Sequence, residues 1–567
     1  MTKNQLTTVV LLFFTVVYLL PLGVRPLLIP DEPRYAEIPR EMIVSGDWVL
    51  PHFNGLKYYE KPVMGYWVHA LSQVALGESN FSVRLPSAIS TGLVAFLILY
   101  ILKSALGRQD KRVYLAPLIF LSSFGVMGIG TITVLDNLLN FFLTAGVGLF
   151  FLASEKKHNS RAERFLLILA GGFVGCAFMT KGFLAFVVPV ITVIPYLFWK
   201  RRASDIIRML WLPAAVALVI SLPWGILAHL KDSDFWNYFF WHEHINRFFS
   251  GGTQHKEPFW YFIVVIIPLF FPWIVMLPTA ISGLVKNNNS KEESSNLISF
   301  CICWFVFPFL FFSFSSGKLA TYILPCLPPL VILTTLGLYT SSKSTQRFLK
   351  SELSLLLFLL FAGISTFIGS QLIGLNLVPL PDSLSVLSAE TLQYSRAVWK
   401  PVIITLSLMF MAVFIFSALK SKDETRKIVY TALSPLLLMV SAPFAIPDLS
   451  LMMKAPGIIL EEEAPKIPED AMVIADSGVF GATCWYLKRN DVFFIQRAGE
   501  VTYGMKRDGN EDRVLSYRAI QQLIADPHEE MIVLILKEKR WNQYFSNSPE
   551  PKAFTSAGKD GFVVVKY

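Results

Sequence analysis

Long apolar runs separated by polar connections constrain this chain more than any other feature of its sequence. A helix needs about 20 predominantly apolar residues to cross a membrane. Runs of that length, or close to it, recur as far as residue 446, and we count thirteen of them. They lie at residues 6–24, 85–102, 113–132, 138–154, 165–180, 183–199, 209–229, 259–285, 296–314, 322–340, 353–373, 400–419 and 429–446. The sequence therefore predicts a polytopic membrane protein that is mainly α-helical.

The composition excludes several other classes of protein. Of the 567 residues, 54% are hydrophobic and only 16% are charged, whereas about 25% are charged in soluble domains. The net charge of +9 does not indicate nucleic-acid binding, because membrane proteins collect Lys and Arg in their cytoplasmic loops. The five cysteines show no paired spacing, so neither a disulfide framework nor a Cys-based zinc site is expected.

The basic residues predict which side of the membrane each connection faces. Every second connection should carry the basic excess if the spans are counted correctly. Five connections of one parity are net basic, and a sixth, 286–293, is charge-balanced; the five are 103–112, 155–164, 200–208, 343–352 and 420–427. These connections and the N-terminus are assigned to the cytoplasm. The two long polar connections, 25–84 and 230–258, and the C-terminal segment are assigned to the opposite side, where function is to be sought.

The composition changes near Pro447 to that of a soluble domain. We therefore divide the chain into a transmembrane catalytic domain, 1–446, and a C-terminal α/β domain, 447–567. A helix is predicted at Leu515–Ile524, and Glu461–Pro468 is interpreted as a charged linker containing proline. The predicted strands are Ala471–Ile474, Val492–Ile495 and Met531–Leu536.

The first long connection contains two candidate clusters. Asp31 and Arg34 directly follow the first span, at a boundary where charge is costly and is usually kept for function. A solvated turn at the start of a helix is an equally good interpretation. Glu60 and Lys61 stand between aromatic residues and a proline. Lys61 can hold a phosphate, with Glu60 as its partner or as a metal ligand, although a surface ion pair is the simpler interpretation.

Further charged residues lie at span boundaries assigned to the same side. Asp136 and Lys181 are each isolated between two apolar runs, where an unpaired charge is expensive. Lys318 is another lysine at a boundary, and the second long connection carries His242 and Arg247. Its His-Glu-His sequence lacks the spacing of a zinc protease. Together these residues come from five connections on one predicted face, which is typical of an active site, whereas a transporter places its charges near mid-membrane.

Six motifs together resemble the aminoarabinose transferases of Gram-negative bacteria. The resemblance is strong from residue 1 to past 330 and looser through the terminal domain. One departure is Pro33, where Thr is usual; it stiffens the turn and removes no charge. The motifs are DEPRYAEIPREM (31–42), SGDW (45–48), YEKP (59–62), MTKGFLA (179–185), WHEHINRF (241–248) and GKLATYIL (317–324).

The resemblance implies a role for each matching residue. Asp31 is similar to the family's essential first-loop acid, Asp136 to its second membrane-boundary acid, and Lys61 to the residue that binds the carrier phosphate. Glu60 and His242 match positions that bind zinc in the family. The remaining matching residues are implied to bind substrate; they are Arg34, Tyr35, Tyr59, Lys181, Arg247 and Lys318.

The resemblance also implies a fold and a reaction. Relatives are integral-membrane glycosyltransferases of the GT-C type that move 4-amino-4-deoxy-L-arabinose from undecaprenyl phosphate to lipid A. We therefore expect a multi-pass protein of the bacterial inner membrane whose active site faces the periplasm, and which gives resistance to polymyxin. Its expected partners are the lipid-linked sugar, lipid A and membrane lipids. Neither a nucleotide cofactor nor a nucleic-acid partner is expected. Two alternatives stay open: a related transferase of the protein O-mannosyltransferase type, and a carrier-lipid flippase without chemistry.

Overall fold

The computed structural model divides into two compact units. It describes residues 1–246, 256–286, 292–339, 343–375, 377–378, 394–395, 397–526, 530–558 and 560–567. The first unit consists of Met1–Leu22, Ser87–His229 and Trp236–Ala445. The second consists of Gly23–Pro86, Leu230–Phe235 and Ile446–Tyr567. The second unit therefore combines the first long connection, the start of the second and the C-terminal segment.

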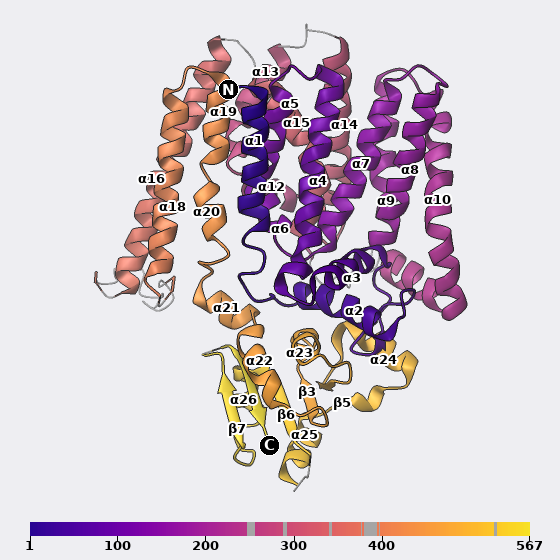
Figure 1. Ribbon diagram of the computed structural model, residues 1–567, viewed down its shortest axis with the longest axis vertical. Coiled ribbons are helices and arrows are strands. Elements are labelled where there is room, and N and C mark those ends of the chain that lie inside the picture. The colour runs from indigo at the N-terminus through magenta and orange to yellow at the C-terminus, as the bar shows by residue number, and fades with distance from the viewer. Residues whose placement is uncertain are drawn as a thin grey trace. The chain divides into compact units, whose positions relative to one another are not determined.

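The first unit is a helical bundle. Figure 1 shows its long helices side by side, with their axes running in one general direction. Its elements are α1 (Lys3–Phe14), η1 (Thr15–Leu19), α4 (Asn80–Leu106, which begins in the second unit), α5 (Arg112–Leu121), α6 (Phe124–Gly130), α7 (Leu135–Ser154), α8 (Arg161–Lys181), α9 (Leu184–Trp199), α10 (Asp205–Lys231, which ends in the second unit), η2 (Asn237–Asn246), α12 (Tyr261–Leu269), η3 (Trp273–Met276), α13 (Leu277–Lys286), α14 (Glu292–Phe314), η4 (Ala320–Cys326), α15 (Leu327–Leu338), α16 (Lys343–Gly374), α18 (Trp399–Lys420), α19 (Glu424–Leu433) and α20 (Leu436–Ser441).

The predicted number of thirteen spans is not confirmed. Within the described residues, eight helices are long and apolar enough to cross a membrane, and ten if each of two bent pairs is one span. Two shorter apolar helices, Lys3–Leu19 and Leu184–Trp199, coincide with predicted spans. The run predicted at 429–446 instead forms α19 and α20, with Pro435 directly before α20. Proline lacks the N–H that would continue the helical hydrogen bonds, so the run is interrupted there.

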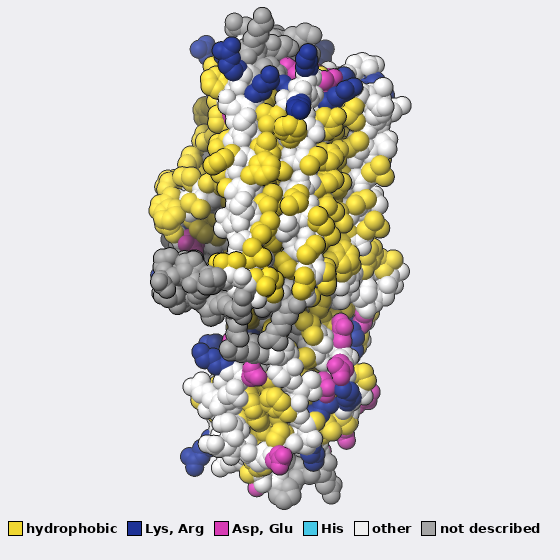
Figure 2. Space-filling model, turned by 90° about the vertical axis from the view of Figure 1, so that its left-hand side faces the viewer, with side chains coloured by type: hydrophobic (Ala, Val, Ile, Leu, Met, Phe, Trp, Pro, Cys, Tyr) yellow, Lys and Arg dark blue, Asp and Glu magenta, His cyan; other side chains and the backbone are white. Residues whose placement is uncertain are grey.

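The outer surface of the first unit is suited to a lipid environment. Figure 2 shows many hydrophobic side chains on the face of the bundle turned to the viewer, with Lys and Arg gathered at the end where the N-terminus lies in Figure 1. Phe358 on α16 and Val413 on α18 are 68% and 61% exposed. Large exposed apolar patches on a soluble protein would be a liability. The surface therefore agrees with the predicted membrane class.

The second unit contains a six-stranded sheet in the order β5-β4-β3-β6-β8-β7. Strands β5, β4, β3 and β6 run parallel to one another, whereas β8 pairs antiparallel with β6 and β7. Strand β6 is almost entirely buried, as an apolar run inside a parallel sheet should be. The strands are β3 (Met472–Ala475), β4 (Phe493–Ile495), β5 (Val514–Leu515), β6 (Ile532–Lys537), β7 (Ala553–Ser556) and β8 (Phe562–Lys566). The three predicted strands are confirmed.

Helices accompany this sheet and the first long connection. The predicted helix at Leu515–Ile524 is confirmed as α25 (Tyr517–Ala525). The other C-terminal elements are α21 (Asp448–Lys454), α22 (Gly457–Glu463), η6 (Ala464–Lys466), α23 (Phe480–Leu487), η7 (Gly499–Val501), α24 (Thr502–Asp508), η8 (Glu511–Arg513) and α26 (Glu538–Tyr544). The first long connection forms α2 (Asp31–Ser45), the two-stranded hairpin β1 (His52–Phe53) and β2 (Leu56–Lys57), and α3 (Met64–Leu76).

The prediction of a linker at Glu461–Pro468 is wrong. Most of that stretch lies in α22 and η6. Glu463 is 3% exposed, and its carboxylate lies 2.6 Å from Lys566 Nζ and 2.9 Å from Lys466 Nζ. A buried carboxylate needs such partners. The charges that suggested a solvated linker therefore hold the helix against the last strand.

The hairpin β1–β2 packs against the C-terminal segment within the second unit. Asn54, at its turn, accepts a hydrogen bond from the Val492 N–H and donates one to the Val492 carbonyl, at 2.9 and 2.8 Å. A Cβ on Gly55 would lie 2.7 Å from the Asn490 carbonyl oxygen, so only glycine allows this close approach. The two stretches, which the predicted division at residue 446 had separated, therefore share one compact unit.

Candidate active site

Helix α2 carries the first candidate residues. Asp31 is its first residue, where a carboxylate interacts favourably with the helix dipole. Arg34 lies one turn later, and its Nη1 donates to Asp31 Oδ1 at 3.3 Å. Its guanidinium carbon lies 5.7 Å from the ring centroid of Tyr35. The Asp31 side chain is 47% exposed and that of Arg34 is 16% exposed, so the acid is open to solvent and the cation is largely enclosed.

Glu500 is a second carboxylate beside Arg34. The Arg34 Nη2 lies 2.7 Å from Glu500 Oε2, which also accepts a hydrogen bond from the Tyr58 hydroxyl at 3.2 Å. Burial raises the pKa of Glu500, and Arg34 partly opposes this effect. Arg34 is thus held between Asp31 and Glu500, residues that are far apart in the sequence.

Tyr59 is fixed by a neighbouring network of charges. Its hydroxyl donates to Asp232 Oδ2 at 2.9 Å, and Lys57 Nζ donates to the same oxygen at 2.9 Å. Asp508 lies 3.4 Å from Lys57 Nζ. Burial alone would raise the pKa of Asp232, but Lys57, Tyr59 and a backbone N–H outweigh it and lower that pKa to about 2. Asp232 therefore stays ionised and holds the chain directly before Glu60 and Lys61.

Glu60 and Lys61 follow Tyr59 directly. The Lys61 Nζ donates to the main-chain carbonyl of Glu60 at 2.9 Å and lies 4.0 Å from its carboxylate. Their side chains are 21% and 20% exposed. Because a fifth of the Lys61 side chain is exposed, this ammonium group can reach a bound anion.

In the first unit, Asp136 and Lys181 form an ion pair. The interpretation of these two residues as isolated charges is wrong: Lys181 Nζ donates to Asp136 Oδ1 at 2.8 Å. Asp136 lies in the first turn of α7, and Lys181 is the last residue of α8, before Gly182. Consecutive antiparallel helices bring the start of one beside the end of the next, so the charges meet. The Lys181 ammonium also lies 5.3 Å from the Tyr322 ring centroid.

The last three predicted residues have different outcomes. Lys318 is 3% exposed and donates to the Glu257 carbonyl at 2.7 Å. His242 lies in η2, but its side chain is outside the described residues, as is the whole of Arg247. Among the side chains that the structure describes, no three His, Cys, Asp or Glu residues gather to hold a metal ion. The zinc site at Glu60 and His242 thus stays a prediction.

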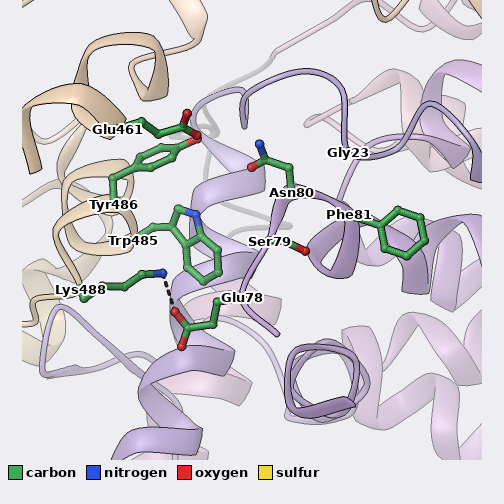
Figure 3. Close-up of a pocket in the computed structure, with 9 residues that line it drawn as sticks. All are labelled: Gly23, Glu78, Ser79, Asn80, Phe81, Glu461, Trp485, Tyr486 and Lys488. Atoms are coloured by element: carbon green, nitrogen blue, oxygen red, sulfur yellow. Dashed lines mark ion pairs between the residues drawn. The ribbon is translucent and has the colours of Figure 1, made fainter. Parts of the chain in front are cut away.

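A cavity of about 340 Å³ opens elsewhere in the second unit (Figure 3). Figure 3 shows Trp485 and Tyr486 on one side of it and the stretch from Glu78 to Phe81 on the other. Lys488 Nζ lies 2.5 Å from the Glu78 carboxylate and 3.8 Å from the Trp485 ring centroid. None of the predicted site residues lines this cavity.

Comparison with known proteins covers the whole chain. A family model described as dolichyl-phosphate-mannose-protein mannosyltransferase matches residues 6–239, and one described as arabinosyl transferase ArnT, C-terminal domain, matches residues 451–565. The undecaprenyl phosphate-alpha-4-amino-4-deoxy-L-arabinose arabinosyl transferase of Shewanella sediminis is 38% identical over 100% of this chain and 98% of its own length. The protein of that name from Serratia proteamaculans is 34% identical over 97% and 96%. The chain belongs to this family of arabinosyl transferases.

The solved structures agree on the fold. The crystal structure of ArnT from Cupriavidus metallidurans bound to undecaprenyl phosphate matches with a TM-score of 0.81, at 22% identity, over 100% of this chain and 98% of that chain. Its apo state matches with a TM-score of 0.79. This arabinosyl transferase is therefore a multi-pass membrane glycosyltransferase of the GT-C type that uses a lipid-linked sugar donor. The predicted family, fold class and enzyme class are confirmed.

Sequence reasoning missed several members of the two charge networks in this arabinosyl transferase. Asp232 follows the seventh predicted span within a cluster of polar residues, so its position offered a usable signal. Lys57 lies four residues before Lys61 in the same connection. Glu500 offered no such signal, because it stands in the C-terminal segment and reaches Arg34 only through the fold.

Proposed function

We propose that this protein transfers 4-amino-4-deoxy-L-arabinose from undecaprenyl phosphate to phosphate groups of lipid A. The reaction would take place on the periplasmic side of the inner membrane and give resistance to polymyxin and other cationic antimicrobial peptides. The observation that carries the proposal is the full-length similarity to two proteins named as transferases of this sugar. The matching ArnT structure with bound undecaprenyl phosphate adds support for the carrier lipid.

Lys61 and Arg34 suit the donor end of this reaction. The carrier phosphate gains negative charge as its bond to the sugar breaks, and cations held in a partly enclosed site stabilise that charge. Lys61 is a point charge that can follow the departing phosphate, whereas Arg34 offers a planar fork for two oxygens. Tyr59 holds the backbone next to Lys61 through its hydrogen bond to Asp232.

The acceptor needs no strong general base. The second pKa of a phosphate monoester is about 6, so a lipid A phosphate is already largely ionised near neutral pH. Asp31 and Asp136 are therefore proposed to act through their charge, orienting the sugar or acceptor and balancing positive charge at the anomeric carbon. Lys181, paired with Asp136, and Lys318 are proposed to hold anionic groups of the substrates, and Arg247 is assigned the same role by resemblance.

A zinc ion at Glu60 and His242 is a further part of the proposal. Carboxylate and imidazole are both zinc ligands, and a bound zinc ion would add positive charge close to Lys61. Metal analysis of the purified protein tests this point. A stoichiometric zinc content that falls in Glu60→Gln supports the site, and a metal-free active protein contradicts it.

Mass spectrometry of lipid A tests the proposed reaction directly. A Gram-negative strain lacking its own aminoarabinose transferase, but still making the lipid-linked sugar, should gain a pentosamine on lipid A when this gene is expressed. The vector alone and Lys61→Ala serve as controls. A transferase of the protein O-mannosyltransferase type would leave lipid A unchanged and add hexose to protein, so the same cells distinguish the two.

A further inference from the structure

The backbone conformation at Gly499 fixes where the side chain of Glu500 lies. Gly499, directly before it, has a φ of +64°, a conformation that L side chains rarely adopt. A Cβ at Gly499 would also lie 3.3 Å from the Cβ of Ser477. The chain thus turns at the glycine that starts η7, and the next residue, Glu500, lies against Arg34 and Tyr58 with its side chain 20% exposed.

The segment that follows Glu500 is anchored to the first long connection. Helix α24 lies so close to β2 that a Cβ at Gly504 would overlap the main-chain carbonyl of Lys57. Asp508, at the end of α24, accepts a hydrogen bond from the Lys57 N–H at 3.2 Å. The ring of Tyr503 lies 6.0 Å from that of Tyr59. These contacts fix α24 on the hairpin, and with it the position of Glu500.

The guanidinium of Arg34 is only partly engaged by these contacts. Nη1 donates to Asp31 and Nη2 lies beside Glu500, whereas the buried Nε has no hydrogen-bond partner among the described residues. Nε and Nη2 form one edge of the rigid fork, the geometry that accepts two oxygens of a phosphate or carboxylate. Glu500 therefore binds Nη2 on this edge, while the Nε–H of the same edge has no acceptor among the described residues.

We propose that Glu500 is a positioning residue that acts through Arg34. Held at Nη2 by Glu500 and at Nη1 by Asp31, the guanidinium is fixed in the orientation in which its Nε edge receives the phosphate of the donor. The inference rests on the proposed function, since it takes Arg34 as a ligand of the carrier phosphate. It gives the C-terminal segment a part in donor binding rather than a purely structural one.

Steady-state kinetics of Glu500→Gln, Arg34→Ala and the double variant test this inference. The full-length protein is purified and assayed with undecaprenyl phosphate-linked aminoarabinose and lipid A. We expect Glu500→Gln to lower kcat/KM for the donor at least about tenfold, mainly through kcat, because a misplacement of 1 Å can cost roughly 10²-fold. In the Arg34→Ala background the same change should have no further effect. Additive losses, or normal kinetics of Glu500→Gln, overturn the proposal.

Two further variants separate positioning from folding. Tyr58→Phe removes one hydrogen bond to Glu500 and keeps its charge, so it should cause a smaller loss that also vanishes with Arg34→Ala. Glu463→Gln breaks a buried ion pair elsewhere in the same unit and should lower thermal stability without changing donor kinetics. If Glu500→Gln does not fold, Tyr58→Phe decides: a loss independent of Arg34 overturns the proposal.

A binding measurement separates this inference from the proposed function. Should the wild-type protein fail to transfer aminoarabinose, the proposed function is wrong, and binding of undecaprenyl phosphate alone is measured in the same variants. Weaker binding in Glu500→Gln that disappears in the Arg34→Ala background supports the positioning role. Equal binding by wild type and Glu500→Gln overturns it.

Discussion

Replacing Glu32 with glutamine should destabilise the second unit more than removing any of its exposed ion pairs. The Glu32 carboxylate is 2% exposed and lies between Arg25 and Arg84, which are 8% and 1% exposed. Its shortest hydrogen bonds are 2.6 Å to Arg25 and 2.7 Å to Arg84. The Leu28 N–H donates to it at 2.8 Å. The three charged side chains come from the end of the first span, the start of α2 and the start of α4.

The size of the effect follows from the pKa of Glu32. Burial alone would raise this pKa, but Arg84 and Arg25 outweigh burial and lower it from 4.5 to about 2. At about 1.4 kcal/mol for each pKa unit, this lowering of the Glu32 pKa corresponds to a contribution of about 3 kcal/mol to the free energy of unfolding. Breaking a buried ion pair on one side costs about 3–5 kcal/mol. We therefore expect Glu32→Gln to lower the free energy of unfolding of the second unit by about 3–5 kcal/mol.

The buried thiol of Cys484 reports on this unfolding. It lies in the second unit and is fully buried, so a thiol-reactive dye labels it only after the unit opens. Labelling should begin at a clearly lower temperature in Glu32→Gln than in the wild type. The folded pKa is lower than the unfolded one, so the contribution of Glu32 is fully present above about pH 4.5 and is lost as the pH falls towards 2.

Glu462→Gln is the matched control, since Glu462 forms an exposed pair with Lys466 four residues away. Exposed pairs contribute little, so its labelling temperature should equal that of the wild type. Equal labelling temperatures for Glu32→Gln and the wild type would refute the reasoning about the buried cluster.

Three other outcomes follow from the site and the topology. Lys61→Ala should abolish transfer while the protein still inserts and folds, as judged by activity and by Cys484 labelling; near-normal transfer would remove Lys61 from the site. Asp31→Asn should lose most activity and Asp31→Glu should recover little, because a longer side chain misplaces the charge; an active Asn variant would make this acid structural. A cysteine at Ser204, in a basic connection, should be protected from a membrane-impermeant reagent in intact cells; rapid labelling would overturn the predicted topology.

Much of the fold could be predicted from local patterns in the sequence. Apolar length gives most of the spans, and the short apolar strands flanking Leu515–Ile524 give the α/β module. Breaks within apolar runs were harder to predict. The run 259–285 is apolar throughout, yet it forms two helices bent by 105° around a break near Pro272. A hydropathy pattern measures how apolar a run is and contains no information on whether the helix bends within it.

The site was predicted in part, and the limits are physical. Residues such as Asp136 and Lys181 stand out because a charge between apolar runs is expensive, but their pairing depends on how α7 and α8 pack. The pair could have been anticipated from an acid at the start of one helix and a lysine at the end of the next. Glu500 could not, because its contact with Arg34 joins residues more than 400 positions apart in the sequence.

Reconstituted transfer with pure components tests the central claim most directly. The purified protein is placed in liposomes with undecaprenyl phosphate-linked aminoarabinose and lipid A, and the lipids are analysed by mass spectrometry. The proposed function predicts lipid A carrying one or more added pentosamines, released undecaprenyl phosphate in equal amount, and neither product with Lys61→Ala. Unmodified lipid A beside an intact donor, from protein that is folded by the Cys484 test, would contradict it.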